Sequence, residues 1–329
     1  MSSFVELPQS RNGAGETRRV GVEMEMADIG LADMAEEVVR RFGGTHEPDG
    51  AFVHRVVDTR YGEFRMELDS SLLKEREYLK FLKRLGVEVD PDAGLDRILS
   101  DLAGIVVPHE LVAPPIPWTA LEEMDGLREG LRARGARGTH ASLLYAFGLQ
   151  LNIEAARLEA DYLRDILRAF ILLYEWLMER GGVDLSRRFT PYVNAFPGRY
   201  ARRILDPDYA PPMDGLIDHY LRDNPTRNRP LDMLPLFAHI DAGRVSAAPV
   251  EHHLVKARPT FHYRLPDCRI DEPDWCLAQP WNDWVAVERL AADPVRLEQL
   301  SREALTAPGH AIGRIGDRWR GALRDLFGD

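Results

Sequence analysis

Residues 19–26 read Arg-Val-Gly-Val-Glu-Met-Glu-Met, and no other stretch of the sequence constrains the fold as strongly. Successive side chains of a β-strand point to opposite faces, so the valines and methionines share one face while Glu23 and Glu25 share the other. The two carboxylates then lie about 7 Å apart and repel each other unless a cation or an arginine lies between them. A solvated strand face, where water and salt screen the repulsion, is the alternative interpretation.

Three later segments repeat this division into an apolar and a polar face. They lie at residues 62–68, 146–154 and 259–265, and in each of them apolar residues alternate with polar ones. A further segment, residues 104–115, is mostly apolar but contains Glu110, a carboxylate that needs a partner if it is buried. The polar positions in or directly after the three alternating segments are Glu67, Asp69, Gln150, Asn152, His262 and Arg264.

Segments with apolar residues at helical spacing lie between these strands. Residues 31–42 and 158–180 show it most clearly, and each ends at a pair of glycines. Further helices are predicted at residues 75–85, 94–103, 119–134, 283–307 and 312–326. Together with the strands, this pattern predicts an α+β protein with a curved, mainly antiparallel sheet, a site on its concave face, and helices packed on the outside.

The length allows two domains or one large one, and because no linker forces a split, the chain is expected to form one domain over residues 19–329. Residues 1–18 are rich in glycine, asparagine and serine, which predicts a flexible tail. Residues 197–235 contain seven prolines and several arginines, which predicts an irregular segment. We interpret this segment as a lid over the site, and a solvated loop is the alternative.

Charge and cysteine content argue against several classes of protein. The chain has 53 acidic and 42 basic residues and a net charge of −11, which disfavours nucleic acid or an anionic membrane as the main partner. Two cysteines in 329 residues make neither a disulfide framework nor a closed zinc site. The longest apolar run, residues 169–174, is too short to span a bilayer. We therefore expect a cytoplasmic protein that is not embedded in a membrane.

Carboxylates, amides, one imidazole and one guanidinium on several strands are typical of a site for a divalent cation and a phosphate. Oxygen ligands suit Mg²⁺ or Mn²⁺, imidazole can complete such a site, and arginine neutralises a transferred phosphoryl group. The sequence contains no P-loop and no glycine-rich dinucleotide motif, so phosphate binding is expected from a sheet face with arginines.

Five motifs, in this order along the chain, carry a resemblance to a known family. They are GVEME at 21–25, ELDSSL at 67–72, HELVAP at 109–114, GLQLNI at 148–153 and TFHYRL at 260–265. The set resembles the amidoligase family, whose members are similar to glutamine synthetase and glutamate–cysteine ligase. The resemblance implies a glutamine synthetase-like catalytic fold and an ATP-dependent carboxylate–amine ligase that forms an amide or isopeptide bond through an acyl phosphate.

The resemblance also implies roles for individual residues. Arg264 would face the transferred phosphoryl group, and Asp69 or Glu67 would accept the proton of the attacking amine. The implied metal ligands, for two Mg²⁺ or Mn²⁺ ions, are Glu23, Glu25, Glu110, Gln150 and His262. The implied contacts to ATP are Glu23, Glu25, Arg264, Arg229 and Lys256. The implied contacts to the acid and amine substrates are Asp69, Ser70, Asn152 and Arg227.

Two positions depart from the family's pattern. Gln150 stands where the family has a histidine, and His262 stands where it has a glutamate. This exchange leaves the metal site one carboxylate poorer and shifts its preference toward Mn²⁺. The alternative is a protein of the same scaffold that binds nucleotide or metal without catalysis. Phosphoryl transfer to a guanidino group is a third interpretation, and the chain could form a homo-oligomer.

Overall fold

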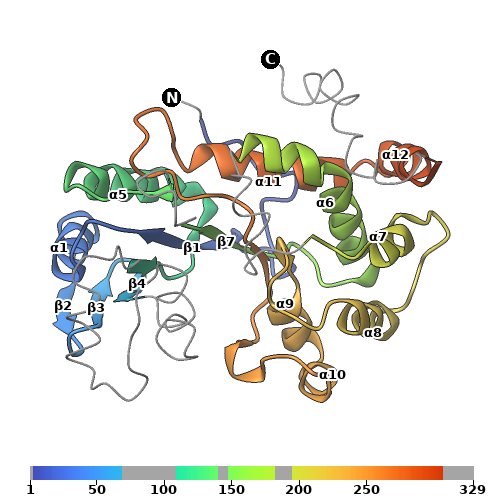
Figure 1. Ribbon diagram of the computed structural model, residues 1–329, viewed down its shortest axis with the longest axis horizontal. Coiled ribbons are helices and arrows are strands. Elements are labelled where there is room, and N and C mark those ends of the chain that lie inside the picture. The colour runs from blue at the N-terminus through green and yellow to red at the C-terminus, as the bar shows by residue number, and fades with distance from the viewer. Residues whose placement is uncertain (1–2, 69–108, 140–146, 182–194, 307–329) are drawn as a thin grey trace, which may run out of the picture.

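One antiparallel sheet organises the structure, a computed structural model that describes residues 3–68, 109–139, 147–181 and 195–306. Within these residues nine strands form the sheet in the order β2-β3-β4-β5-β1-β7-β9-β8, with the short β6 paired to β1 (Figure 1). The strands are β1 (Arg19–Met26), β2 (Thr45–Pro48), β3 (Val53–Thr59), β4 (Gly62–Leu68), β5 (His109–Val112), β6 (Ile116–Pro117), β7 (Leu149–Glu154), β8 (Leu231–Asp232) and β9 (Thr260–Tyr263).

Helices lie on both sides of the middle of the sheet (Figure 1). Figure 1 shows α5, α6 and α11 along one side of β1 and β7, and α9 and α10 on the other side. The α-helices are α1 (Leu31–Phe42), α5 (Leu121–Ala133), α6 (Ala160–Arg180), α7 (Gly198–Leu205), α8 (Met213–Asp223), α9 (Leu234–Ile240), α10 (Ala242–Ala247), α11 (Ala278–Ala291) and α12 (Pro294–Thr306).

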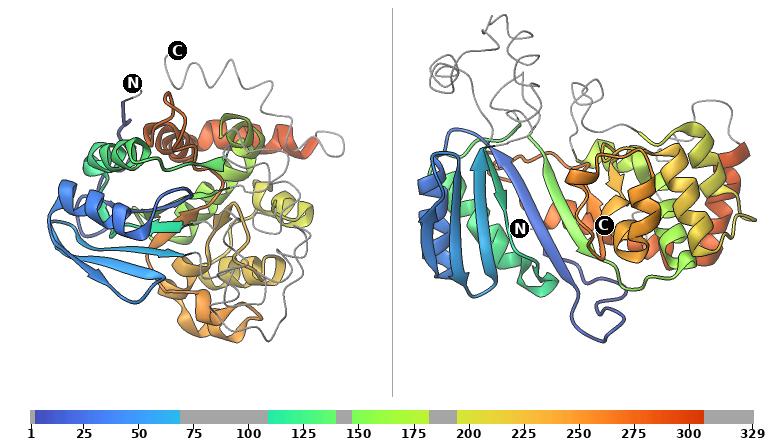
Figure 2. Two further views of the ribbon diagram at one scale, coloured as in Figure 1. Left: turned by 60° about the vertical axis from the view of Figure 1, so that its left-hand side comes forward. Right: turned by 90° about the horizontal axis from the view of Figure 1, so that it is seen from below.

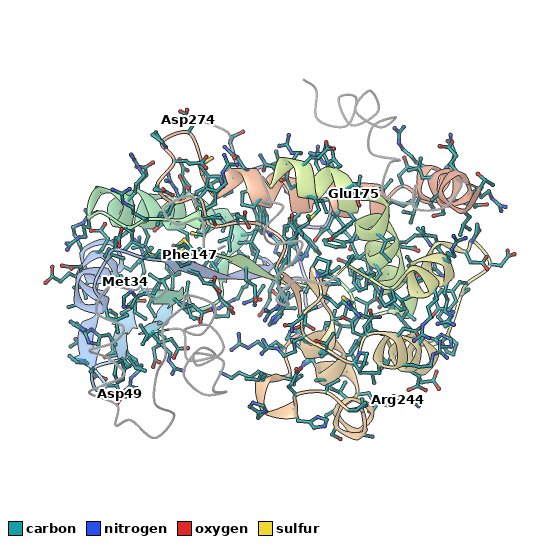
Figure 3. All side chains as sticks on the ribbon, in the orientation of Figure 1. Met34, Asp49, Phe147, Glu175, Arg244 and Asp274 are labelled. Carbon is teal, nitrogen blue, oxygen red and sulfur yellow. The ribbon has the colours of Figure 1, made fainter. Side chains whose placement is uncertain are left out.

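The alternation in β1 decides which face of the sheet is buried. Val20, Val22, Met24 and Met26 are fully buried, and the apolar residues of β4, β5, β7 and β9 join them in one core. Phe147, which is 1% exposed, lies between α5 and β1 in the same layer (Figure 3). The polar side chains of the strands therefore have to occupy the opposite face, because the side chains of a strand alternate.

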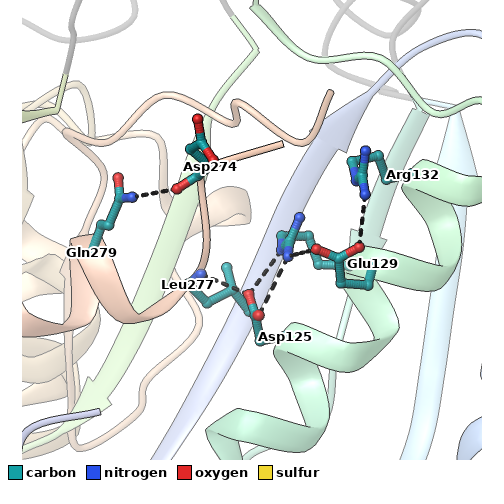
Figure 4. Close-up of polar contacts among 7 residues, drawn as sticks. Asp125, Glu129, Arg132, Asp274, Leu277 and Gln279 are labelled. Atoms are coloured by element: carbon teal, nitrogen blue, oxygen red, sulfur yellow. Dashed lines mark hydrogen bonds and ion pairs between the residues drawn. The ribbon is translucent and has the colours of Figure 1, made fainter. Parts of the chain in front are cut away.

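Polar contacts fix α5 in this layer (Figure 4). Asp125 Oδ1 accepts hydrogen bonds from the backbone N–H of Leu277 and from Arg128 Nε, both at 2.8 Å. Glu129 Oε2 accepts a further bond from Arg132 at 3.0 Å. Because Leu277 directly precedes α11, these bonds tie α5 to the start of α11 above the sheet.

The predicted α+β architecture with a mainly antiparallel sheet is confirmed. The helix predicted at residues 31–42 has these bounds, and Gly43 ends it with a φ of 73°, which only glycine adopts readily. In the segment predicted as one helix from 283 to 307, α11 ends at Ala291 and α12 begins at Pro294, where proline suits the first turn. The helices predicted at 75–85, 94–103 and 312–326 lie outside the described residues.

No helix of the described ranges combines the length and apolarity needed to cross a membrane.

Residues 3–18 are not the loose tail that the sequence predicted. The backbone N–H of Val5 donates to Asn282 Oδ1, and Trp281 Nε1 donates to the carbonyl of Val5, both at 2.9 Å. Leu7 is 3% exposed in the core. Arg18 is fully buried and makes two hydrogen bonds to Glu288, at 2.9 and 2.7 Å. Contacts with α11, far away in the sequence, therefore order this segment.

The prediction of an irregular segment at residues 197–235 is also wrong. The segment folds into α7, α8 and β8, and α7 and α8 each begin directly after a proline, at Pro197 and Pro212. The first N–H groups of a helix have no partner within the helix, so proline at this position costs no hydrogen bond. In this segment these two prolines therefore precede helices and do not indicate irregular structure. The segment also contributes the last strand of the sheet.

Candidate functional site

The strand register brings three carboxylates into one row on the polar face. Glu25 of β1 lies directly opposite Glu110 of β5, and Glu110 lies directly opposite Glu67 of β4. Directly opposed residues of antiparallel strands share a face and have Cβ atoms about 4.5–5.5 Å apart. We call Glu25, Glu110 and Glu67 the carboxylate row. Figure 2 shows the strands of this half of the sheet side by side.

Two groups hold the ends of the carboxylate row. Glu25 Oε2 accepts a 2.6 Å hydrogen bond from the backbone N–H of Gly148, which precedes β7. Arg65 Nη2 lies 2.5 Å from Glu67 Oε2 and compensates one of the negative charges. Like charges directly opposite each other destabilise a sheet, so a row of three carboxylates is costly without cations.

A chain of hydrogen bonds runs from Glu23 across the middle of the polar face. Asn152 Nδ2 donates to Glu23 Oε1 at 2.6 Å, and Gln150 Nε2 donates to Asn152 Oδ1 at 2.7 Å. Gln150 Nε2 also lies 3.1 Å from Nδ1 of His262 on β9. Gln150, Asn152 and His262 are all less than 9% exposed. We call these four residues the amide relay.

Beyond the amide relay, two arginines flank one buried carboxylate. Asp232 of β8 lies directly opposite His262 and is fully buried. Its Oδ2 is 3.7 Å from Nε of Arg227 and 3.8 Å from Nε of Arg264, while its Oδ1 accepts a 2.9 Å bond from the backbone N–H of Leu234. Both arginines are about one-fifth exposed, so their side chains reach the surface of the site. We call Arg227 and Arg264 the arginine pair.

Burial and like charges shift the pKa values on this side of the site. Burial lowers the pKa of His262 well below its usual range, and the positive charges of Arg264, Arg227 and Arg258 lower it further. Burial raises the pKa of Asp232, although Arg264 and Arg227 oppose this shift. His262 is therefore neutral at physiological pH.

The structure brings most of the predicted site residues together. Glu23, Glu25, Glu67, Glu110, Gln150, Asn152 and His262 share one face of the sheet, with Arg227 and Arg264 close to Asp232 at the β8–β9 edge. Asp69 and Ser70 lie outside the described residues.

Two further predicted phosphate ligands are Arg229 and Lys256. Arg229 donates from Nε to Asn224 Oδ1 and from Nη1 to the carbonyl of Ala195, both at 2.9 Å, so it joins loops of the helical layer. Lys256 is exposed in the segment that precedes β9. These contacts give Arg229 a structural use, which the sequence prediction did not anticipate.

The chemistry of the carboxylate row suits a hard divalent cation, since carboxylate oxygens are its preferred ligands. In the part of the chain that is described, however, no three His, Cys, Asp or Glu side chains are arranged to hold a metal ion. The strand register places the three carboxylates in one row, as a metal site requires. Their side chains would have to rotate toward a common point before they could bind an ion together.

Sequence reasoning missed Asp232. It lies in a strand of two residues between Pro230 and Pro235, which is too short to show any alternation. The only signal was an aspartate inside an apolar stretch flanked by prolines, where a buried carboxylate requires a partner.

The fold and the shared polar face can now be compared with known proteins. A family model described as "Putative amidoligase enzyme" matches residues 16–286, which span β1 to α11. The chain belongs to this family. We found no match among curated proteins or among solved structures. The match contains the strands that carry the carboxylate row, the amide relay and the arginine pair, so the amidoligase family shares the segments that build this site.

Proposed function

We propose that the protein is an ATP- and divalent-metal-dependent ligase that joins a carboxylate to an amine. The observation that supports this most is the division of one sheet face into an acidic half, the carboxylate row, and a basic half, the arginine pair. A ligase of this kind needs cations and guanidinium groups to stabilise the charge of a transferred phosphoryl group. Membership of the amidoligase family supports the same reaction class.

Glu25, Glu110 and Glu23 would hold Mg²⁺ or Mn²⁺ in this proposal. When bound, the cation neutralises charge on phosphate oxygens and orients them. The three carboxylates contribute by facing one side of β1 and β5, and the backbone N–H of Gly148 donates to Glu25 Oε2.

The arginine pair would stabilise the transfer of the γ-phosphoryl group. A carboxylate oxygen of the acid substrate forms a bond to phosphorus as the bond to ADP breaks, which gives an acyl phosphate. Negative charge on the transferred group is then met by Arg264 and Arg227, whose guanidinium groups Asp232 holds in place.

The amine would attack in the second step. Its nitrogen bonds to the carbonyl carbon of the acyl phosphate, phosphate leaves, and the amine proton passes to a carboxylate. Glu67 is the described candidate for this acceptor because it lies at the end of the carboxylate row and is only partly buried. Water has to be excluded during this step, since it competes with the amine.

Binding of nucleotide without turnover is the second candidate function. The uncharged side chains of Gln150 and Asn152 in the middle of the face, and the separation of the described carboxylates, favour it. Both functions use the same residues, so only turnover distinguishes them.

Release of ADP from ATP tests the proposal. We expect ADP to form with Mg²⁺ or Mn²⁺ only when a carboxylate and an amine are both present, in pools of amino acids, small peptides and cell-wall fragments. Glu25→Gln should abolish release, whereas Glu303→Gln, an exposed change on α12, should leave it unchanged. Binding of Mg-ATP without any release of ADP would instead establish the second candidate.

A further inference from the structure

Several polar atoms at the β8–β9 edge are buried without a hydrogen bond. Among the described residues, His262 Nε2, Arg227 Nε and Arg264 Nε have no hydrogen-bond partner, and neither does Asp232 Oδ2 between the two arginines. Buried polar groups in native proteins are nearly always hydrogen-bonded. Arg227 Nε and Arg264 Nε face Asp232 Oδ2 at 3.7 and 3.8 Å, whereas among the described residues no such contact accounts for His262 Nε2, which is therefore the atom to explain. The chemistry of a ligand for this atom follows from whether it donates or accepts.

The amide relay determines the donors and acceptors step by step. Glu23 is a carboxylate and can only accept, so the Asn152 atom 2.6 Å away has to be the NH₂ group. Asn152 then presents its carbonyl oxygen to Gln150, whose NH₂ group donates at 2.7 Å. The second hydrogen of that NH₂ group points to His262 Nδ1 at 3.1 Å, so Nδ1 accepts and the ring proton is on Nε2.

The opposite tautomer of His262 breaks this chain. A proton on Nδ1 would require Gln150 to turn its carbonyl oxygen toward the ring and Asn152 to turn its NH₂ group toward Gln150. The carbonyl oxygen of Asn152 would then face the Glu23 carboxylate at 2.6 Å, where two acceptors repel each other. Glu23 thereby assigns the proton of a ring that lies two strands away.

A buried Nε2–H cannot bind a metal ion, because metals bind the unprotonated nitrogen of imidazole. It can donate to an oxyanion. The positive charges near His262 come from Arg227, Arg264 and Arg258. Asp232 lies opposite His262 in the strand register, and its Oδ2 lies between two of these arginines. The surroundings of the ring thus favour an anion over a cation.

We propose that His262 Nε2–H, Arg227 and Arg264 form an oxyanion-binding pocket, and that His262 is an anion donor and not a metal ligand. The proposal deepens the proposed function and rests on it for the choice of ligand: the oxyanion is a phosphate of the nucleotide or the carboxylate of the acid substrate. It differs from the sequence-based prediction, which placed His262 among the metal ligands. His262 stands where the family's pattern has a glutamate. A hydrogen-bond donor therefore replaces a carboxylate in the basic half of the site.

Nuclear magnetic resonance of protein with ¹⁵N-labelled histidine tests the pocket without any turnover. The chain has 10 histidines, and the signal that disappears in His262→Gln identifies His262. We expect the Nε2–H tautomer in the free protein. We expect the Nε2 signal to shift on titration with inorganic phosphate or acetate in the presence of a chelator, and a response to only one of these anions identifies the class of ligand.

Two variants keep the test independent of folding. His262→Leu removes the donor and should weaken binding of the responding anion about tenfold, whereas His262→Gln retains an N–H group near the same place and should restore most of it. His253→Ala, an exposed change, is the control. An Nδ1–H tautomer in the free protein, or no response to either anion, would overturn the proposal. The test needs no ATP turnover, so its failure is distinct from a failure to detect ligase activity.

Discussion

Asn152 of β7 donates a 2.6 Å hydrogen bond to Glu23 of β1, although Gly21, not Glu23, is its direct partner in the strand register. The contact is diagonal, and Gly21 places no side chain against the Asn152 amide. A Cβ atom placed on Gly21 would lie 3.4 Å from Cβ and Nδ2 of Asn152. The glycine therefore makes room for the amide that orients the rest of the amide relay.

Substitutions at Gly21 test how large a side chain the Asn152 amide tolerates next to it. A distance of 3.4 Å is ordinary van der Waals contact, so Gly21→Ala should leave nucleotide binding close to that of wild type. Gly21→Val adds two methyl groups against Asn152 and should displace its side chain, weakening nucleotide binding at least tenfold. Titration of ATP with Mg²⁺ in a calorimeter measures both. Equal affinities for Gly21→Val and wild type would mean that the relay does not orient the site.

Removal of one carboxylate from the carboxylate row should abolish metal-dependent binding of nucleotide. ATP with Mg²⁺ or Mn²⁺ should stabilise the wild-type protein by about 2–3 kcal/mol at concentrations about 100-fold above the dissociation constant. Glu25→Gln and Glu110→Gln should lose most of this stabilisation, because two negative ligands oppose each other there. Thermal unfolding with and without metal measures the effect. A wild-type response in both variants would place the metal elsewhere.

The buried pair of Arg18 and Glu288 should contribute strongly to stability. Glu288 is 4% exposed and also accepts a 2.7 Å bond from Trp284 Nε1. Arg18→Leu leaves this carboxylate buried without its cation and should lower the free energy of unfolding by about 3–5 kcal/mol. Denaturant titration measures it, with Arg302→Leu on the surface of α12 as a control that should not change the midpoint. A similar midpoint for Arg18→Leu would mean that this buried pair does not contribute to stability.

Asp283 should make stability depend on pH in the weakly acidic range. Burial raises its pKa to about 6, although Arg180 Nε lies 2.6 Å away. Because the folded protein holds this proton more tightly than the unfolded chain, the contribution is full below about pH 4 and is lost as the pH rises through 6. Asp283→Asn cannot lose a proton, so between pH 5 and 7.5 it should gain about 1 kcal/mol of stability relative to wild type. Parallel unfolding curves at both pH values would contradict the assigned shift.

The polar face of the sheet could be predicted wherever a single strand alternates apolar and polar residues. The alternation in residues 19–26 and 62–68 predicted which side chains of β1 and β4 share the polar face, because burial of valine, methionine and phenylalanine leaves only one register. The same reasoning placed Gln150, Asn152 and His262 on that face. The motif order added the family, which no single strand could identify.

Long-range partners were beyond sequence reasoning. In the sequence Arg18 ends a polar segment, and only the structure shows that it binds Glu288, 270 residues later. Asp232 lies in a strand of two residues, so no periodicity marks it, and only β9 reveals its position opposite His262. The direction of hydrogen bonds in the amide relay likewise requires the distances between side chains on three strands.

Transfer of oxygen from the acid substrate to phosphate tests the central claim most directly. Once the ADP screen has found a carboxylate and an amine that support turnover, the carboxylate is labelled with ¹⁸O and the released phosphate is analysed by mass spectrometry. The acyl-phosphate route predicts one labelled oxygen in phosphate for each amide formed, because the carboxylate oxygen that attacks phosphorus leaves with it. Unlabelled phosphate accompanying amide formation would contradict the account.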